Sequence, residues 1–164
     1  MAKISIVCDT GPIIGYARAN YIHLFPQLFE VVAIPEGVRD ELLRGGDRPG
    51  AREARECPWL QTEKAQLSQT FNECYRTLGE GESQAIALAE IKGWPLFLED
   101  GPARKIAVRY VPLIIGSGLL LKMALSQGLI PSARTVLQAL ADAKYRLGPK
   151  IIQEILVQLG EPPL

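Results

Sequence analysis

Short apolar runs that end in turn residues alternate along the chain with segments whose apolar residues repeat at helical spacing. The runs 4–8, 31–34, 95–98 and 113–115 predict strands. Helices are predicted in the segments 12–17, 22–29, 35–43, 51–55, 66–78, 82–93, 102–110, 119–126, 133–145 and 149–159. Because strands alternate with helices, the pattern predicts an α/β fold with a mostly parallel central sheet, covered by helices on both faces, and a helical C-terminal part.

The composition is typical of a folded globular chain. Of the 164 residues, 48% are hydrophobic and 22% are charged, which excludes a collagen-like, low-complexity or disordered protein. The sequence contains no internal repeat and no linker-like stretch. We therefore expect a single domain over residues 1–164.

Features of membrane or exported proteins are not predicted. The chain opens directly into a predicted strand, and the apolar run 111–121 is too short to cross a bilayer. We expect a soluble, cytoplasmic protein with no membrane partner. The cysteines form no CxxC pair, so reduced thiols are expected rather than a disulfide or a zinc site. These cysteines are Cys8, Cys57 and Cys74.

Acidic residues lie where ligands bind in α/β proteins, at the carboxyl ends of predicted strands. Asp9 follows the first strand, and Glu99 and Asp100 follow the strand 95–98, while Glu41 and Glu82 belong to neighbouring helices. Carboxylates gathered at one place repel each other unless a cation offsets their charge. Oxygen ligands without His or Cys suit Mg²⁺ or Mn²⁺, and such a centre would hydrolyse a phosphodiester with metal-activated water.

Each of these residues also has a purely structural interpretation. Asp9 could cap the following helix, and Glu41 could be a solvated helix residue. Glu82 lies in a first helical turn, which favours negative charge, and Glu99 and Asp100 could be turn residues.

The charge is zero overall but unevenly distributed. Residues 1–100 hold ten basic and fifteen acidic side chains, whereas residues 101–164 hold eight and three. Arg104, Lys105 and Arg109 follow the acidic turn closely, so they could neutralise phosphates beside a metal centre. A second arginine-rich run, over residues 39–55, is either a self-paired solvated face or an RNA-contacting loop.

The residues around the acidic positions resemble those of PIN domains. IVCDTGPII, which contains Asp9, and AIPEGVRDEL, which contains Glu41, resemble the opening strand and the "IPxxVxxEL" segment of that family. GESQAIALA, with Glu82, and LFLEDGPAR, with Glu99 and Asp100, are similar to one PIN-like family of bacterial and archaeal proteins predicted to bind nucleic acid. The similarity continues through 116–120 and 128–132 into the C-terminal helices, and so covers nearly the whole chain.

This resemblance implies a three-layer α/β/α sandwich and metal-dependent ribonuclease chemistry. The ligands of Mg²⁺ or Mn²⁺ would be Asp9, Glu41, Glu82 and one or both of Glu99 and Asp100. The relatives include VapC-type toxins of type II toxin–antitoxin pairs, which makes RNA the expected substrate and a small antitoxin protein a candidate partner. The apolar C-terminal helices could cover the sheet, pair two subunits as a homodimer or bind a partner peptide.

The chain departs from the family pattern at three positions. PIN nucleases usually have Asp where Glu82 stands, and Gln84 occupies a place where this family often has a second Glu. Glu99 stands where Asp is common. The resemblance also places Ser117 near the rim of the acidic pocket, where its hydroxyl could bind a phosphate or a metal-bound water; formation of a local turn is the structural alternative.

Two other functions remain open at this point. A PIN-like module could bind nucleic acid or protein without cleaving it. A phospho-acceptor or phosphatase fold could use Asp9, although residue 11 is Gly and the DxD spacing of a phosphatase nucleophile is therefore missing.

Overall fold

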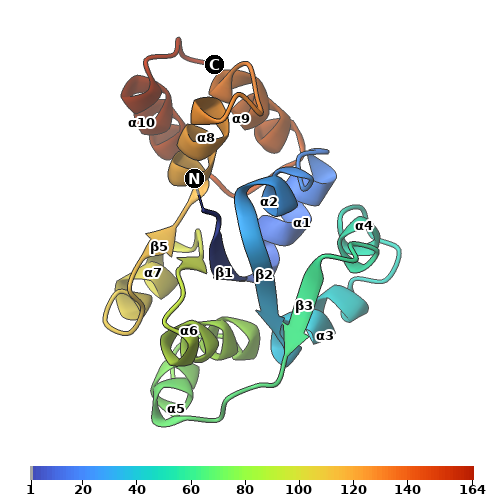
Figure 1. Cartoon of the computed structure of the whole chain (residues 1–164), viewed down its shortest axis with the longest axis vertical. Coiled ribbons are helices and arrows are strands. Elements are labelled where there is room, and N and C mark those ends of the chain that lie inside the picture. Colours follow the sequence, from blue (N-terminus) through green and yellow to red (C-terminus); the bar gives the residue numbers. More distant parts are fainter. Residues whose placement is uncertain (1) are drawn as a thin grey trace.

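A computed structural model describes residues 2–164 and shows a five-stranded, fully parallel sheet (Figure 1). The strand order is β3-β2-β1-β4-β5, so β1 is central. The chain places β2 and β3 on one side of β1 and then β4 and β5 on the other. The strands are β1 (Ile4–Cys8), β2 (Phe29–Pro35), β3 (Leu60–Glu63), β4 (Leu96–Phe97) and β5 (Ile114–Ile115). The predicted α/β fold with a parallel sheet is confirmed.

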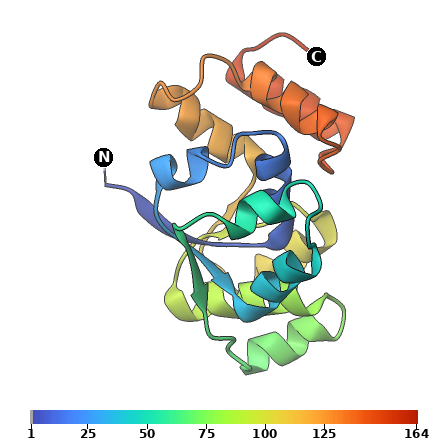
Figure 2. The same ribbon diagram turned by 90° about the vertical axis from the view of Figure 1, so that its right-hand side faces the viewer.

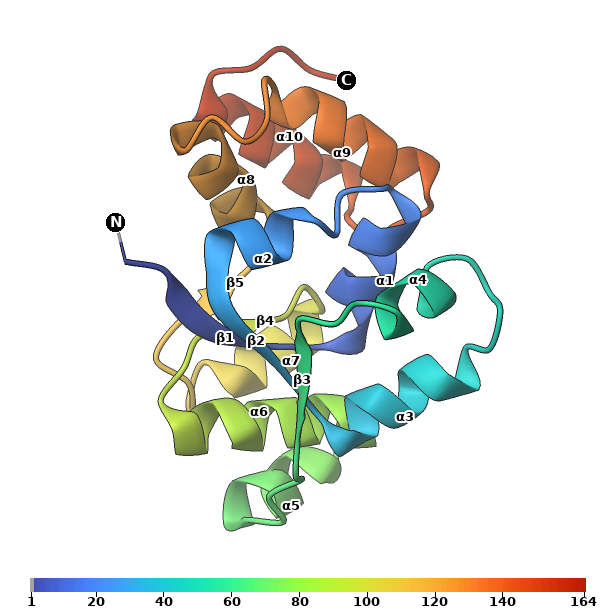
Figure 3. The same cartoon turned by 45° about the vertical axis from the view of Figure 1, so that its right-hand side comes forward.

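Helices cover both faces of this sheet (Figures 2 and 3). One face carries α1 (Thr10–Arg18), α2 (Leu24–Leu28), α4 (Ala51–Arg55), α8 (Ser117–Ser126), α9 (Ala133–Asp142) and α10 (Pro149–Leu159). The opposite face carries α5 (Gln69–Tyr75), α6 (Glu80–Lys92) and α7 (Gly101–Ala107). The remaining helix, α3 (Glu36–Arg44), follows β2 and packs against α6. The predicted three layers and the helical C-terminal part are both present.

The central strand supplies both hydrophobic cores, because successive side chains of a strand point to opposite faces. Ile6 and Cys8 belong to the core under α1, α2 and α8–α10, whereas Val7 belongs to the core under α6 and α7. All three are fully buried. A strand buried on both sides reads as a continuous apolar run, which is the pattern that predicted it.

Several boundaries differ from those predicted. The helix expected over 22–29 ends at Leu28, because Phe29 pairs with Ile4 as the first residue of β2. The helix expected to reach residue 145 ends at Asp142, and Lys144 takes a left-handed conformation with φ of 62°. The edge strand β3 was not predicted, since its sequence LQTE has neither an apolar run nor an apolar face. None of the helices in residues 2–164 is long and apolar enough to cross a membrane.

The C-terminal segment is tied to α9 by one carboxylate. Glu161 accepts hydrogen bonds from the backbone N–H of Ala133 (2.7 Å) and of Arg134 (2.8 Å), and from the hydroxyl of Ser132 (2.7 Å). Burial raises its pKa, but these three hydrogen bonds together outweigh burial, so the pKa lies below the ordinary value of 4.5. The negative charge also lies at the N-terminus of α9, where the helix dipole favours it.

We expect Glu161→Gln to lower the free energy of unfolding by about 1 kcal/mol at neutral pH, because Gln keeps one acceptor oxygen but places an NH2 group, which cannot accept a hydrogen bond, where the second carboxylate oxygen accepts one. A carboxylate whose pKa is lowered on folding stabilises the protein above its unfolded pKa, and loses that effect as the pH falls through its folded pKa. The difference between the two proteins should therefore shrink below about pH 4 in urea unfolding experiments. Glu154→Gln on the exposed side of α10 is the matched control, expected within about 0.5 kcal/mol of the parent.

Candidate functional site

Asp9 lies at the carboxyl end of the central strand and is held there by the sheet. Its backbone N–H donates to Phe97 O in β4 (3.1 Å), which fixes its position between β1 and β4. It occupies the N-cap position of α1, yet its side chain makes no capping hydrogen bond. The structural interpretation of Asp9 as a helix cap therefore does not account for the residue.

The surroundings of Asp9 favour its protonated form. Burial is the largest cause, opposed by the amide of Thr10, and the charges of Glu82, Glu41 and Asp100 add to the effect of burial. Together they raise the pKa of Asp9 from 3.8 to about 7. Three carboxylates, from α3, from α6 and from the N-cap of α7, are thus close enough to Asp9 to repel its charge.

Glu41 is held in place by two small neighbours. The hydroxyl of Thr10, the first residue of α1, donates to Glu41 Oε2 (2.5 Å). On the other side, a Cβ on Gly81 would lie 3.0 Å from Glu41 Cδ and closer still to Oε1. Only glycine therefore lets α6 approach this carboxylate so closely. The helix predicted over 82–93 begins two residues earlier, at Glu80, so that Gly81 lies inside α6.

Glu82 carries an unsatisfied polar atom. Its Oε2 is buried and accepts no hydrogen bond from any of residues 2–164. Burial, followed by the charges of Asp100 and Glu41, raises its pKa. A buried oxygen without a donor is costly, and it is the kind of atom that a bound cation would satisfy.

Gln84 connects the two helices that carry these glutamates. Its side-chain Oε1 accepts from the backbone N–H of Gly37 at the start of α3 (2.7 Å), and its Nε2 donates to Glu80 (3.3 Å). Gln84 is 5% exposed. Gln84 therefore fixes α3 against α6. It does so at the position where the resembling family often has a second Glu.

Glu99 and Asp100 are adjacent in sequence but turn to different helices. Asp100 caps α7 by accepting from the backbone N–H of Ala103 (2.8 Å), and its charge still acts on Asp9 and Glu82. Glu99 instead faces the N-terminus of α8, where Ser117 donates to it from the backbone N–H (2.6 Å) and from the hydroxyl (2.7 Å).

A buried chain of hydroxyl groups continues from Glu99 into the apolar core. Tyr16 donates to the hydroxyl of Ser117 (2.8 Å), and burial followed by the charge of Glu99 raises the pKa of both Tyr16 and Tyr145. The hydroxyl of Tyr145 is buried and has no hydrogen-bond partner among residues 2–164. Neither tyrosine stood out in the sequence, because only the fold brings α1 and the segment after α9 to the same side of Glu99.

Three of the four residues predicted to contact nucleic acid lie on α7 or just after it, and the fourth, Ser117, begins α8. Lys105 and Arg109 are exposed, and Arg104 is half-buried. The guanidinium of Arg104 and the carboxylate of Glu99 both lie within 3.0 Å of the point where a Cβ on Gly116 would be. Ser117 is 1% exposed and its hydroxyl is engaged by Tyr16 and Glu99, which gives its predicted contact with RNA no support.

The donor set fits a hard divalent cation. Within residues 2–164, no three His, Cys, Asp or Glu side chains are arranged to hold an ion together as they stand. However, Asp9 and Glu82 are destabilised in their charged forms, Glu82 has an unsatisfied oxygen, and all the neighbouring donors are carboxylates. Mg²⁺ and Mn²⁺ prefer such oxygen ligands.

Comparison with known proteins identifies the family of the chain. A family model described as a PIN domain matches residues 5–161, almost the whole chain. The chain belongs to the PIN-domain family. PIN domains have a nuclease-like fold, generally act on nucleic acids, and typically use Mg²⁺ or Mn²⁺. A search of curated proteins finds no match to this chain.

The raised pKa of Asp9 predicts how this PIN domain responds to pH without metal. Because the folded state binds this proton more tightly than the unfolded state, stability should fall as pH rises from about 4 to about 7. Asp9→Asn removes that penalty, and its largest possible gain is about 4 kcal/mol, since a tenfold change in proton affinity corresponds to about 1.4 kcal/mol.

Urea unfolding in EDTA should therefore show Asp9→Asn more stable than the parent, by a larger margin at about pH 8 than at about pH 5. Asp47→Asn, in the exposed loop before α4, controls for the loss of one negative charge. An equal margin at both pH values would contradict the assigned cause.

Proposed function

We propose that this PIN domain is a metal-dependent ribonuclease. The observation that carries the proposal is the placement of four acidic side chains whose charges act on one another: Asp9 after β1, Glu41 in α3, Glu82 in α6 and Asp100 at the N-cap of α7. Asp9, Glu41 and Glu82 are half-buried and Asp100 is exposed, and several negative charges held this close together are unfavourable unless a cation offsets them. The family membership adds the nuclease-like fold.

In this proposal Asp9, Glu41, Glu82 and Asp100 hold one or two Mg²⁺ or Mn²⁺ ions. When bound, the metal supplies Lewis-acid activation of water and of the scissile phosphate. Thr10 orients Glu41, and Gln84 holds α3 and α6 together so that Glu41 and Glu82 stay close. Glu99 is the alternate ligand, which would have to leave Ser117 to reach the ion.

The proposed substrate is RNA. Arg104, Lys105 and Arg109 would neutralise its phosphates beside the carboxylates. Further parts of the proposal are a toxin role with a small antitoxin protein as partner, a homodimer, a cytoplasmic location, and a single domain formed by residues 1–164.

One observation favours a second function, a PIN domain that binds nucleic acid or protein without cleaving it. Asp100 is already used as a helix cap, and Glu99 is already bound by Ser117. If neither turns towards the metal, only the three carboxylates of Asp9, Glu41 and Glu82 remain and the centre lacks its fourth ligand. Metal binding and RNA cleavage, measured separately, distinguish the two functions.

Mn²⁺ should raise the melting temperature of the purified protein, because the ion binds the folded site and not the unfolded chain. At a hundredfold excess over Kd the stabilisation is about 2.7 kcal/mol, which is about 5–10 °C for a chain of this length. The shift should disappear in Asp9→Asn and in Glu82→Gln, and both variants should lose Mn²⁺-dependent cleavage of a single-stranded RNA.

Asp47→Asn serves again as the control and should keep both the shift and the cleavage. A normal shift without cleavage would select the non-catalytic module. Full Mn²⁺-dependent activity in Asp9→Asn would exclude the assigned centre.

Gly81→Ala tests the centre without removing a carboxylate. The new methyl group occupies space now taken by the end of the Glu41 side chain, which is flexible enough to move away. We expect a protein that folds normally, since Ala favours a helix over Gly by about 1 kcal/mol, but that binds Mn²⁺ at least about tenfold more weakly. Gly11→Ala in α1 is the matched control, because no atom lies within 4 Å of its added Cβ. Equal Mn²⁺ affinities for the two variants, measured by calorimetry, would show that Glu41 is not a ligand.

A further inference from the structure

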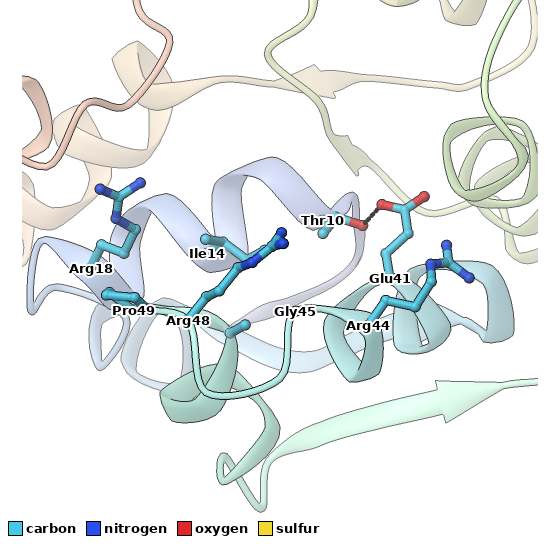
Figure 4. Close-up of a pocket in the computed structure, with 9 residues that line it drawn as sticks. Thr10, Ile14, Arg18, Glu41, Arg44, Gly45, Arg48 and Pro49 are labelled. Atoms are coloured by element: carbon cyan, nitrogen blue, oxygen red, sulfur yellow. Dashed lines mark hydrogen bonds between the residues drawn. The ribbon is translucent and has the colours of Figure 1, made fainter.

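A cavity of about 580 Å³ opens beside Glu41, between α1 and the loop that joins α3 to α4 (Figure 4). Arg18, Arg44 and Arg48 line it, and Thr10 and Glu41 form the end next to the acidic centre. Figure 4 shows the guanidinium groups of Arg18 and Arg48 on one side of the Glu41 side chain and that of Arg44 on the other. We call this cavity the arginine groove.

The arginines of this region fall into two classes. Arg39 pairs with Asp40 (3.1 Å) and Arg52 pairs with Glu56 (3.2 Å), while Arg55 donates to two backbone carbonyl groups in and before the loop. The other three are the groove arginines. Arg18, Arg44 and Arg48 are exposed, and no hydrogen-bond acceptor or carboxylate among residues 2–164 engages them. The arginines without a partner are thus the ones that share one cavity.

The groove is held in shape by a close backbone approach. Gly50 has a φ of 89°, and a Cβ there would lie 2.7 Å from Ile14 O and would also strike the side chain of Arg18. The amide of Gly50 donates to Glu53 (2.7 Å), which fixes the end of the loop. The loop is therefore anchored against α1, and Arg48 is carried by anchored backbone rather than by a free segment.

The charge and lining of the groove suit a phosphate backbone. Three arginines against the single carboxylate of Glu41 leave the lining positive, and the guanidinium group binds phosphate through two parallel hydrogen bonds. No aromatic ring is among the described residues that line it, so binding would rest on charge rather than on base stacking. A cavity of this size admits part of a single strand but not a duplex.

We propose that the arginine groove binds consecutive phosphates of single-stranded RNA and leads the strand to the carboxylates at Asp9. This inference rests on the proposed nuclease function and adds to it the path of the substrate on one side of the centre. Binding there is independent of base sequence, because the groove contacts the backbone alone.

The test is RNA binding by the full chain in EDTA, where no metal-dependent cleavage occurs. The probe is an end-labelled uridine oligonucleotide, followed by fluorescence anisotropy over a range of salt concentrations. Arg44→Ala with Arg48→Ala is compared with Arg39→Ala with Arg52→Ala, which removes two positive charges from the same stretch of chain. We expect the groove variant to bind on the order of tenfold more weakly, and its salt slope to be flatter by about 1.4 for two lost phosphate contacts. The control variant should bind within about twofold of the parent, since its arginines are exposed and already paired.

If the two double variants lose RNA affinity equally, the loss is due to the overall charge of the protein and the inference is overturned. A glutamate-rich peptide that competes as well as RNA would also overturn it, by assigning the groove to an acidic protein segment. If melting shows the groove variant to be unfolded, Arg44→Lys with Arg48→Lys replaces it, and weaker binding at unchanged charge is the expected result. The nuclease function and the groove can fail separately. If the parent protein cleaves no RNA but the groove variant still binds RNA more weakly than the control variant, the nuclease function is refuted and the binding of RNA in the groove is retained.

Discussion

Mutual repulsion of carboxylates beyond the end of β1 is the constraint around which this structure is built. Two of the acidic side chains nearest that point are relieved by neutral donors, Glu41 by the hydroxyl of Thr10 and Asp100 by an amide of α7. Glu99, one residue further, is relieved by the first turn of α8. The amide of Thr10 only partly offsets the burial of Asp9, Glu82 has an oxygen without a partner, and the pKa values of both residues are raised. The charge that the fold does not neutralise is therefore concentrated on two residues.

The same contacts that relieve the charges also assemble the layers. The hydrogen bond from the backbone N–H of Gly37 to Gln84 joins α3 to α6. The hydrogen bonds that link Tyr16, Ser117 and Glu99 join α1 to α8 and to the segment after β4. Helices from both faces of the sheet thus meet at its carboxyl edge through polar contacts, while their apolar sides fill two separate cores. A substitution in one of these contacts would change both the acidic centre and the packing of the helices. A substitution at Gly81 is therefore better suited to change the acidic centre alone.

The sequence was informative wherever a local pattern determines the structure. The apolar runs of β1, β2 and β4, and the acidic residues that follow them, could be read directly because strand ends are local features. The polar edge strand β3 could not, since it is defined by pairing with β2 rather than by its own residues. The divergence of Glu99 from Asp100 was equally hidden, because it depends on which helix start each one meets. The arginine run over 39–55 gave two interpretations, and the structure divides it residue by residue into paired and unpaired side chains.

The distribution of charge also gives the site a direction. The arginine groove lies beside α1 and α3, towards the β2 and β3 edge of the sheet, whereas Arg104 and Lys105 belong to α7, which follows β4 on the other side of β1. Asp9 lies between them. An RNA strand held by both basic regions would therefore cross the carboxyl edge of the sheet. One of its phosphate groups would then lie over the carboxylates, which would repel that phosphate unless a cation were bound. In this arrangement the basic regions would supply the affinity for RNA, and the cation would offset the repulsion between the phosphate and the carboxylates. Binding and cleavage would then depend on different residues of one surface.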